Sequence, residues 1–103
     1  VPVTTEQLAG TTWEFGRASS NGAPLGRLGD LSLDADGTVG IYNNSNEVTW
    51  IIEDGTLFLV SGNGIQSTCF SNVVIVDGVI QELQGPFLLN PSAGIVHYLR
   101  KVD

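Results

Sequence analysis

The fold is decided by residues 47–61, which read EVTWIIEDGTLFLVS. In its first half, residues 47–53, apolar side chains stand at every second position. Val48, Trp50 and Ile52 would therefore share one face of a strand. The dipeptide Asp54-Gly55 follows and supplies the positive φ angles that a tight hairpin requires. The residues after it are apolar on both faces. This pattern predicts an antiparallel β-hairpin with one face in a core.

Similar turn-forming dipeptides recur along the chain. Further turn dipeptides are Asn21-Gly22, Asp36-Gly37, Asn63-Gly64 and Asp77-Gly78. From Asp36 onward, turn signals return every 8 to 14 residues, a spacing typical of sandwiches and barrels. Between the turns we predict strands over residues 11–17, 28–34, 38–43, 47–53, 56–61, 65–76, 79–89 and 95–102.

Four local features refine this layout. The long segment 65–76 is expected to bend near Ser71-Asn72. Pro86 requires an edge or a bulge in its strand. Thr4 and Gln7 stand at capping-box spacing, which predicts a short helical turn over residues 4–9. Residues 18–26, rich in Ser, Asn, Gly and Pro, are predicted to form a mobile loop.

Composition supports an all-β chain. Only 15% of the 103 residues are charged, 13 are glycine and none is methionine, which argues against exposed helices. A sheet without helices to cover a face must fold onto itself. We therefore predict one all-β domain over residues 1–103, an antiparallel up-and-down meander of about eight short strands forming a small closed or nearly closed barrel.

Charge and cysteine content exclude several classes of function. The net charge is −7 with only four fixed cations, so the chain lacks the basic stripe of a nucleic-acid binder. The longest apolar runs, 73–76 and 87–89, are far shorter than the ~20 residues of a membrane helix, so no membrane insertion is expected. Cys69 is alone, which precludes an intrachain disulfide and favours a buried inert thiol.

Residues 8–15, LAGTTWEF, resemble the start of calycins, the group of lipocalins, avidins and small bacterial metalloprotease inhibitors. In those families a short helical turn precedes a Gly and a Trp on the first strand. A basic residue on or after the last strand often packs over that Trp. The resemblance implies that Trp13 takes this position and that Arg100 or Lys101 covers it.

Residues 36–42, DGTVGIY, also look like the second hairpin of avidins, whose Tyr points into the ligand cup. Tyr42 would be that residue. The position after Trp13 does not match the ligand-binding Asn of avidins, so the resemblance does not extend to biotin. Likeness to the protease inhibitors implies a free N-terminal tail, here residues 1–5.

Residues 42–50, YNNSNEVTW, gather two aromatic rings, several amides and one carboxylate around one hairpin. Proteins typically hold sugars in this way, because an aromatic face stacks on C–H groups while amides and carboxylates bind hydroxyls. The alternative interpretation is an ordinary Asn-rich turn with Trp50 in the core. The single histidine, His97, is either a polar anchor or general base inside a cup, or a hydrogen-bonded core residue.

No metal or cofactor motif stands out. Residues 34–37, DADG, resemble part of a calcium loop, but the bidentate Glu at loop position twelve is missing and a hairpin turn explains them. One His and one Cys do not make a transition-metal site. The sequence contains no phosphate loop, dinucleotide fingerprint or nucleophile elbow.

We therefore predict a non-catalytic binding module for a small ligand or a glycan, without a cofactor. The candidate ligand-binding residues are Tyr42, Asn44, Asn46, Glu47, Trp50 and His97. Three alternatives stay open. The chain could be a protease inhibitor that inserts residues 1–5, an isomerase or cyclase that uses His97, or a structural or dimerisation domain of a larger protein that forms a homodimer.

Overall fold

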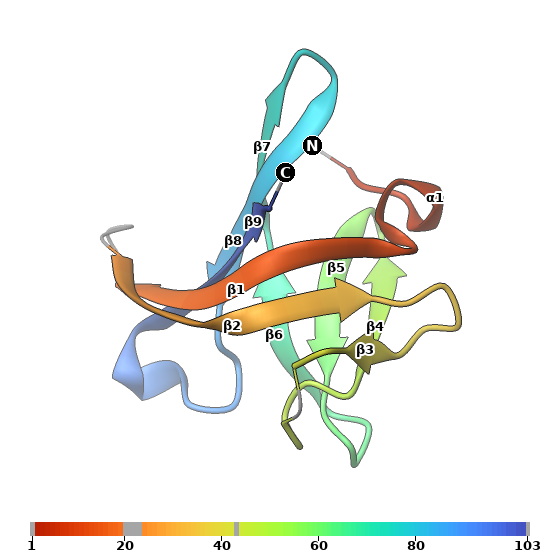
Figure 1. Cartoon of the computed structure of the whole chain (residues 1–103). Coiled ribbons are helices and arrows are strands. Elements are labelled where there is room, and N and C mark those ends of the chain that lie inside the picture. The colour runs from red at the N-terminus through yellow and green to blue at the C-terminus, as the bar shows by residue number, and fades with distance from the viewer. Residues whose placement is uncertain (1, 20–23, 43, 103) are drawn as a thin grey trace.

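The computed structural model describes residues 2–19, 24–42 and 44–102, and these form an antiparallel all-β structure (Figure 1). A short helix, α1 (Thr5–Leu8), precedes the first strand, and a 3-10 turn spans Pro91–Ala93. Six strands form one sheet in the order β3-β2-β1-β9-β8-β7, and three form another in the order β4-β5-β6. The strands are β1 (Thr11–Ser19), β2 (Pro24–Leu33), β3 (Val39–Gly40), β4 (Thr49–Glu53), β5 (Thr56–Val60), β6 (Gln66–Phe70), β7 (Asn72–Val76), β8 (Val79–Pro86) and β9 (Ile95–Lys101).

Two hairpins form at Asp-Gly dipeptides, as the sequence predicts. In the β4–β5 turn, Asp54 and Gly55 have φ angles of 52° and 76°. In the β7–β8 turn, Asp77 and Gly78 have φ angles of 52° and 79°. Positive φ at both central residues is the signature of the turn whose twist matches that of the flanking strands.

The predicted capping box at the N-terminus is confirmed. The Gln7 amide donates to the Thr4 hydroxyl at 3.3 Å, and the Thr4 amide donates to the Gln7 side-chain oxygen at 2.9 Å. Both contacts satisfy amides that a helix leaves without an internal partner. They fix the turn that delivers buried Leu8 to the core.

The predicted strand over residues 65–76 is two strands that belong to different sheets. β6 ends at Phe70 and β7 begins at Asn72, so the expected bend is present and the chain changes sheet at Ser71. Because one expected strand is two, the described residues contain more strands than the expected eight.

The predicted mobile loop over residues 18–26 is wrong at both of its ends. β1 continues through Ser19 and β2 already begins at Pro24, while residues 20–23 lie outside the described residues. Pairing between the two strands extends to Ala18 and Pro24. Long-range strand pairing therefore overrides the loop-forming composition of this segment.

The predicted strand over residues 38–43 is reduced to Val39 and Gly40. Ile41 has a φ angle of 65°, in the left-handed region that β-branched residues rarely adopt, and this ends the strand. The Tyr42 amide donates to the Gly40 carbonyl at 2.6 Å, so the chain turns sharply here.

Replacing Ile41 by asparagine is expected to raise the free energy of unfolding by about 1 kcal/mol, because Asn tolerates the left-handed region that strains Ile. The Ile41 side chain is 69% exposed, so little apolar burial is lost. Urea denaturation of I41N measures the effect. The matched control is I65N, since Ile65 is 53% exposed and no positive φ is found there. An equal free energy of unfolding for I41N and I65N would contradict backbone strain at Ile41.

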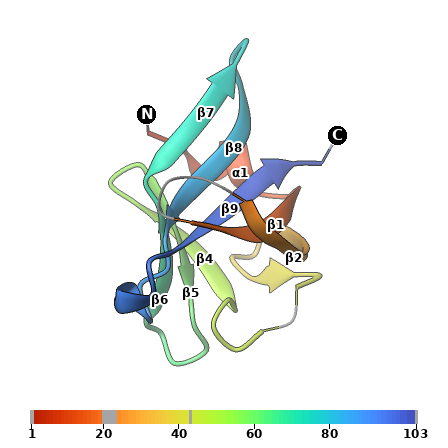
Figure 2. The ribbon, with the colours of Figure 1, turned by 90° about the vertical axis from the view of Figure 1, so that its left-hand side faces the viewer.

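In the part of the chain that the structure describes, neither sheet closes on itself, so the closed barrel that we expected is not confirmed. Isolated bridges join the sheets on two sides, Thr38 with Thr49 and Thr68 with Phe87. Near the second bridge the backbones of β6 and β8 nearly touch, because Gly85 has no side chain to separate them. The β7–β8 hairpin continues beyond the body of the molecule, as the two perpendicular views show (Figures 1 and 2).

The core lies between the two sheets, and period-two patterning predicts part of it correctly. Trp50 is buried, whereas Val48, expected on the same face, is 38% exposed and lies before β4 begins. Trp13 is 4% exposed, and Phe15, next on the same face of β1, is fully buried. The main apolar residues of the core are Leu8, Trp13, Phe15, Leu31, Leu33, Trp50, Leu57, Leu59, Phe70, Leu83 and Leu99. Among the described residues, no helix is long and apolar enough to cross a bilayer.

Candidate functional site

The structure separates the six residues predicted to bind ligand. Trp50 is 5% exposed, and its indole N–H donates to the Asp34 carbonyl at 2.9 Å. Its ring packs in the core and offers no free face for stacking, as the alternative interpretation held. Asn44 is exposed, while Asn46 and Tyr42 are partly buried.

Tyr42 and His97 both contact the ring of buried Phe15. The Phe15 ring centroid lies 5.0 Å from that of Tyr42 and 4.8 Å from that of His97, both edge-on. The Phe87 ring centroid lies 4.8 Å from that of His97, with the two rings tilted by 50°. These are packing contacts of an aromatic core.

His97 is a satisfied core residue. It is 4% exposed, and its Nδ1 shares a 2.8 Å hydrogen bond with the buried Thr68 hydroxyl. Burial, and then the nearby charge of Arg17, lower the pKa of His97 to about 4. An enclosed imidazole of this pKa is poorly suited to act as a general base near neutral pH.

The Asn-rich turn satisfies its own polar groups. The Asn44 side-chain oxygen accepts from the Asn46 amide at 2.8 Å, and its amide group donates to the Tyr42 hydroxyl at 3.4 Å. Asparagine commonly stabilises turns by such contacts with its own backbone neighbourhood. The turn therefore explains Asn44 without a ligand.

Glu47 follows this turn and is unusual. Its side chain is 4% exposed, and its Oε2 is the buried side-chain polar atom in the described residues that has no hydrogen-bond partner. Burial raises the pKa of Glu47 to about 7. The carboxyl group therefore changes charge near neutral pH.

A shallow pocket of about 350 Å³ lies beside the Asn-rich turn. Asn46 comes from this turn, Asn63 from the β5–β6 turn, and exposed Ile65 and Leu89 supply apolar surface. Of the six predicted residues, only Asn46 lines it. The pocket thus combines amides with apolar side chains, although none of its walls is aromatic.

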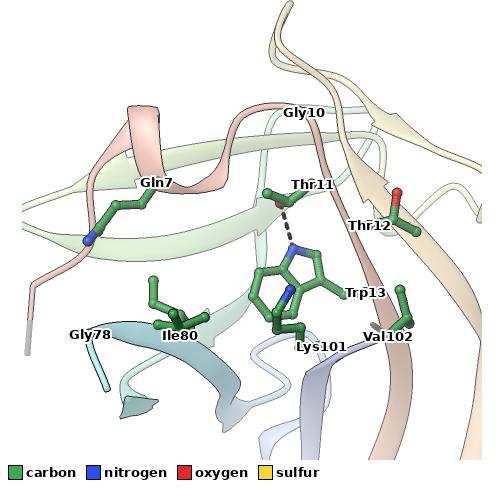
Figure 3. Close-up of a pocket in the computed structure, with 10 residues that line it drawn as sticks. Gln7, Gly10, Thr11, Thr12, Trp13, Gly78, Ile80, Lys101 and Val102 are labelled. Atoms are coloured by element: carbon green, nitrogen blue, oxygen red, sulfur yellow. Dashed lines mark hydrogen bonds between the residues drawn. The ribbon is translucent and has the colours of Figure 1, made fainter. Parts of the chain in front are cut away.

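A larger pocket of about 510 Å³ lies at the other end of the molecule (Figure 3). Trp13 and Ile80 form buried walls, and Gln7, Thr12, Lys101 and others surround them. The Trp13 indole N–H donates to the Thr11 hydroxyl at 2.7 Å, which in turn donates to the Leu8 carbonyl at 2.5 Å. This chain of hydrogen bonds holds the indole fixed.

Sequence reasoning missed this pocket because its walls come from distant segments. They are α1 and β1, the β7–β8 turn, and the end of β9. The available signal was the motif at residues 8–15 together with the two cations near the C-terminus. No local pattern indicates that the turn at Gly78 reaches this end.

Lys101, rather than Arg100, is the cation on the Trp13 side of the sheet. Lys101 pairs with Trp13 in the β1–β9 register, and Figure 3 shows the two side chains next to each other. Arg100 points to the opposite face, where it lies 4.7 Å from the Tyr98 ring centroid and donates to Glu82 at 2.9 Å.

We expected a free N-terminal tail, but its described residues contact the rest of the chain. Val3 is 2% exposed, and its amide donates to the Gly55 carbonyl at 2.8 Å. Pro2 packs against Gly55, with Val1 outside the described residues. An inhibitor that inserts this tail into a protease would first have to break these contacts.

In the acidic turn at residues 34–37, the carboxylates of Asp34 and Asp36 bind the neighbouring Thr38 hydroxyl. The Thr38 hydroxyl donates to Asp36 at 2.6 Å and approaches Asp34 at 3.3 Å. The part of the chain that the structure describes contains no cluster of three or more His, Cys, Asp or Glu suited to a metal.

Cys69 is half-buried, and burial raises the pKa of its thiol.

Comparison with protein family models, curated proteins and solved structures finds no match to this chain.

Proposed function

We propose that the protein is a non-catalytic binding domain that holds a small ligand in the pocket beside Trp13. The observation that carries this proposal is the pocket of about 510 Å³, which falls in the size range of small-molecule sites. Its walls combine the apolar side chains of Trp13, Ile80 and Val102 with the polar side chains of Gln7, Thr12 and Lys101, which come from three different elements.

The lining suggests the chemistry of the ligand. Gln7 and Thr12 offer hydrogen-bond donors, and Lys101 is the charged side chain of the lining. In a chain of net charge −7, a cation beside apolar walls favours a ligand with an apolar body and an anionic group. We therefore favour a small amphipathic anion.

The resemblance to calycins supports the same proposal. The calycin pattern expects a cation near the first-strand tryptophan, and Lys101 lies opposite Trp13. Bridges between the two sheets on both sides are compatible with a nearly closed barrel. The proposed ligand would enter through one end of that barrel, as in ligand-binding barrels.

The fluorescent probe 1-anilinonaphthalene-8-sulfonate, an apolar ring system with one sulfonate, tests the site. We expect saturable binding to the native protein, and V102E should weaken it at least ~10-fold by placing an anion in the lining. Fluorescence titration and calorimetry measure the affinity. V48E is the matched control, because Val48 is similarly exposed and lies outside this pocket. Equal affinity of V102E and V48E would refute the site.

A glycan is the second candidate ligand, and the pocket that contains Asn46 and Asn63 favours it. Two amides beside the exposed apolar surface of Ile65 and Leu89 could bind hydroxyls and C–H groups of a sugar. A glycan array followed by calorimetry with N46A tests this version. Sugar binding that N46A leaves intact, or an array without a positive signal, would remove it.

A further inference from the structure

We propose that the free edge of β7 pairs antiparallel with β7 of a second copy of this chain, so that the two six-stranded sheets become one. The proposal does not depend on a bound ligand: the β7–β8 turn lines the pocket, but none of Asn72–Val76 does. It rests on the composition, exposure and register of the β7–β8 hairpin.

β7 is an open edge of the larger sheet. It is last in the strand order, and within the described residues it pairs with β8 alone, so alternate N–H and C=O groups along Asn72–Val76 face away from the sheet. The strand contains neither a charge nor a proline, two devices that protect an edge from pairing. The register shift beside Val74 places its extra residue, Gln81, on β8 rather than on the edge strand. The opposite edge, β3, has only two residues.

The hairpin is also apolar where it is exposed. Val74, Ile75, Val76 and Val79 are 48%, 38%, 52% and 44% exposed, respectively. Figures 1 and 2 show the hairpin extending beyond the rest of the chain, so a second hairpin can approach its edge without meeting the body of the molecule. Adjacent apolar side chains on a projecting edge are a typical feature of an interaction site.

The sequence of the edge suits pairing with itself. A two-fold axis at Val74 places Val74 opposite its own copy, Val73 opposite Ile75, and Asn72 opposite Val76. In this register Asp77, the acid in the hairpin turn, lies opposite Ser71 of the other copy rather than opposite another acid. The exposed Ser71 hydroxyl can then donate to the Asp77 carboxylate.

The charge distribution permits pairing along this edge. Two chains of net charge −7 repel each other overall. Asn72–Val76 itself is uncharged, and Glu82, which stands opposite Val74 on β8, is paired with Arg100 at 2.9 Å. A five-residue edge buries less area than a standard interface, so we expect a weak dimer with Kd of roughly 10 µM to 1 mM.

Sedimentation velocity of the wild-type chain between about 10 µM and 1 mM tests the proposal. We expect a concentration-dependent monomer–dimer equilibrium, and V74K should raise Kd at least ~10-fold because it places two ammonium groups directly opposite each other. I65K is the control: Ile65 is apolar and 53% exposed but lies outside the hairpin, so its Kd should match that of the wild type. A wild-type monomer throughout, or a V74K dimer as strong as the wild type, would overturn the proposal.

A crosslink tests the register separately. V74C in a C69S background should form an intermolecular disulfide on mild oxidation, since opposite residues of an antiparallel pair have Cα atoms about 4.5–5.5 Å apart, a separation that a disulfide can span. V48C in the same background should not. If V74C crosslinks no faster than V48C, the pairing centred on Val74 is wrong.

Discussion

Replacing Gly85 by alanine is expected to destabilise the protein by about 4 kcal/mol or more, a large share of the total stability of a domain this size. A Cβ on Gly85 would overlap the carbonyl oxygen of Cys69 and lie 2.6 Å from its carbonyl carbon and 2.9 Å from the Cα of Phe70. Because all three atoms belong to the β6 backbone, no side-chain rotation relieves the overlap. The two strands would have to separate where the sheets join.

Urea denaturation followed by tryptophan fluorescence and circular dichroism measures this loss. G62A is the matched control, because a Cβ on Gly62 meets its nearest atoms at ordinary contact distances of 3.7 and 3.8 Å. We expect G62A to change stability by less than about 0.5 kcal/mol. A G85A variant within about 1 kcal/mol of the wild type would show that β6 and β8 do not approach this closely.

Replacing Glu47 by glutamine is expected to stabilise the protein at pH 8 by about 3 kcal/mol and to have little effect at pH 4.5. The pKa of Glu47 is raised from 4.5 to about 7, so the folded state prefers the protonated carboxyl group. The stability contributed by that proton is complete below pH 4.5. It is lost as the pH rises from 4.5 to about 7, where the ionised carboxylate has no hydrogen-bond partner for Oε2.

His97 has the opposite dependence over nearly the same range. Its pKa is lowered from 6.5 to about 4, so the unfolded state binds a proton that the folded state does not. The stability associated with neutral His97 is therefore complete above pH 6.5 and is lost as the pH falls toward 4, again by about 3 kcal/mol.

Between pH 4.5 and 6.5 the two contributions oppose each other, so together they leave the wild-type free energy of unfolding nearly independent of pH. In the same window E47Q should gain stability as the pH rises, whereas H97F should lose it. H97F keeps a ring between Phe15 and Phe87, although it leaves the Thr68 hydroxyl without its partner. Denaturation of wild type, both variants and the double variant at several pH values measures the slopes. Parallel slopes for E47Q and H97F would contradict the opposed shifts.

Much of the local structure could be predicted from sequence because local residues determine it. Thr4 and Gln7 cap the helix through contacts within one turn, and the Asp-Gly pairs at 54–55 and 77–78 adopt the conformation that a hairpin needs. The alternation of Trp13 with Phe15 correctly predicted two core residues. Such features depend on the residues themselves and little on the rest of the chain.

The candidate sites were less predictable. Trp50 and Glu47 belong to an apparently polar stretch, yet both are buried: Trp50 packs in the core, and Glu47 is 4% exposed. The pocket beside Trp13 needs Gly78 and Lys101 at the same place, and they lie far from Trp13 in sequence. Residue type alone therefore could not separate packing residues from surface residues here.

By itself the sequence determined an antiparallel all-β chain with defined turns and one apolar face per strand, because these follow from period-two alternation and turn chemistry. Tertiary structure alone decided that the chain changes sheet at Ser71, that β8 crosses β6 at Gly85, and that β7 is left as an open edge. These outcomes depend on which strand edges meet, and any two extended segments can satisfy the same backbone hydrogen bonds. Only the packing of the whole core selects among those pairings.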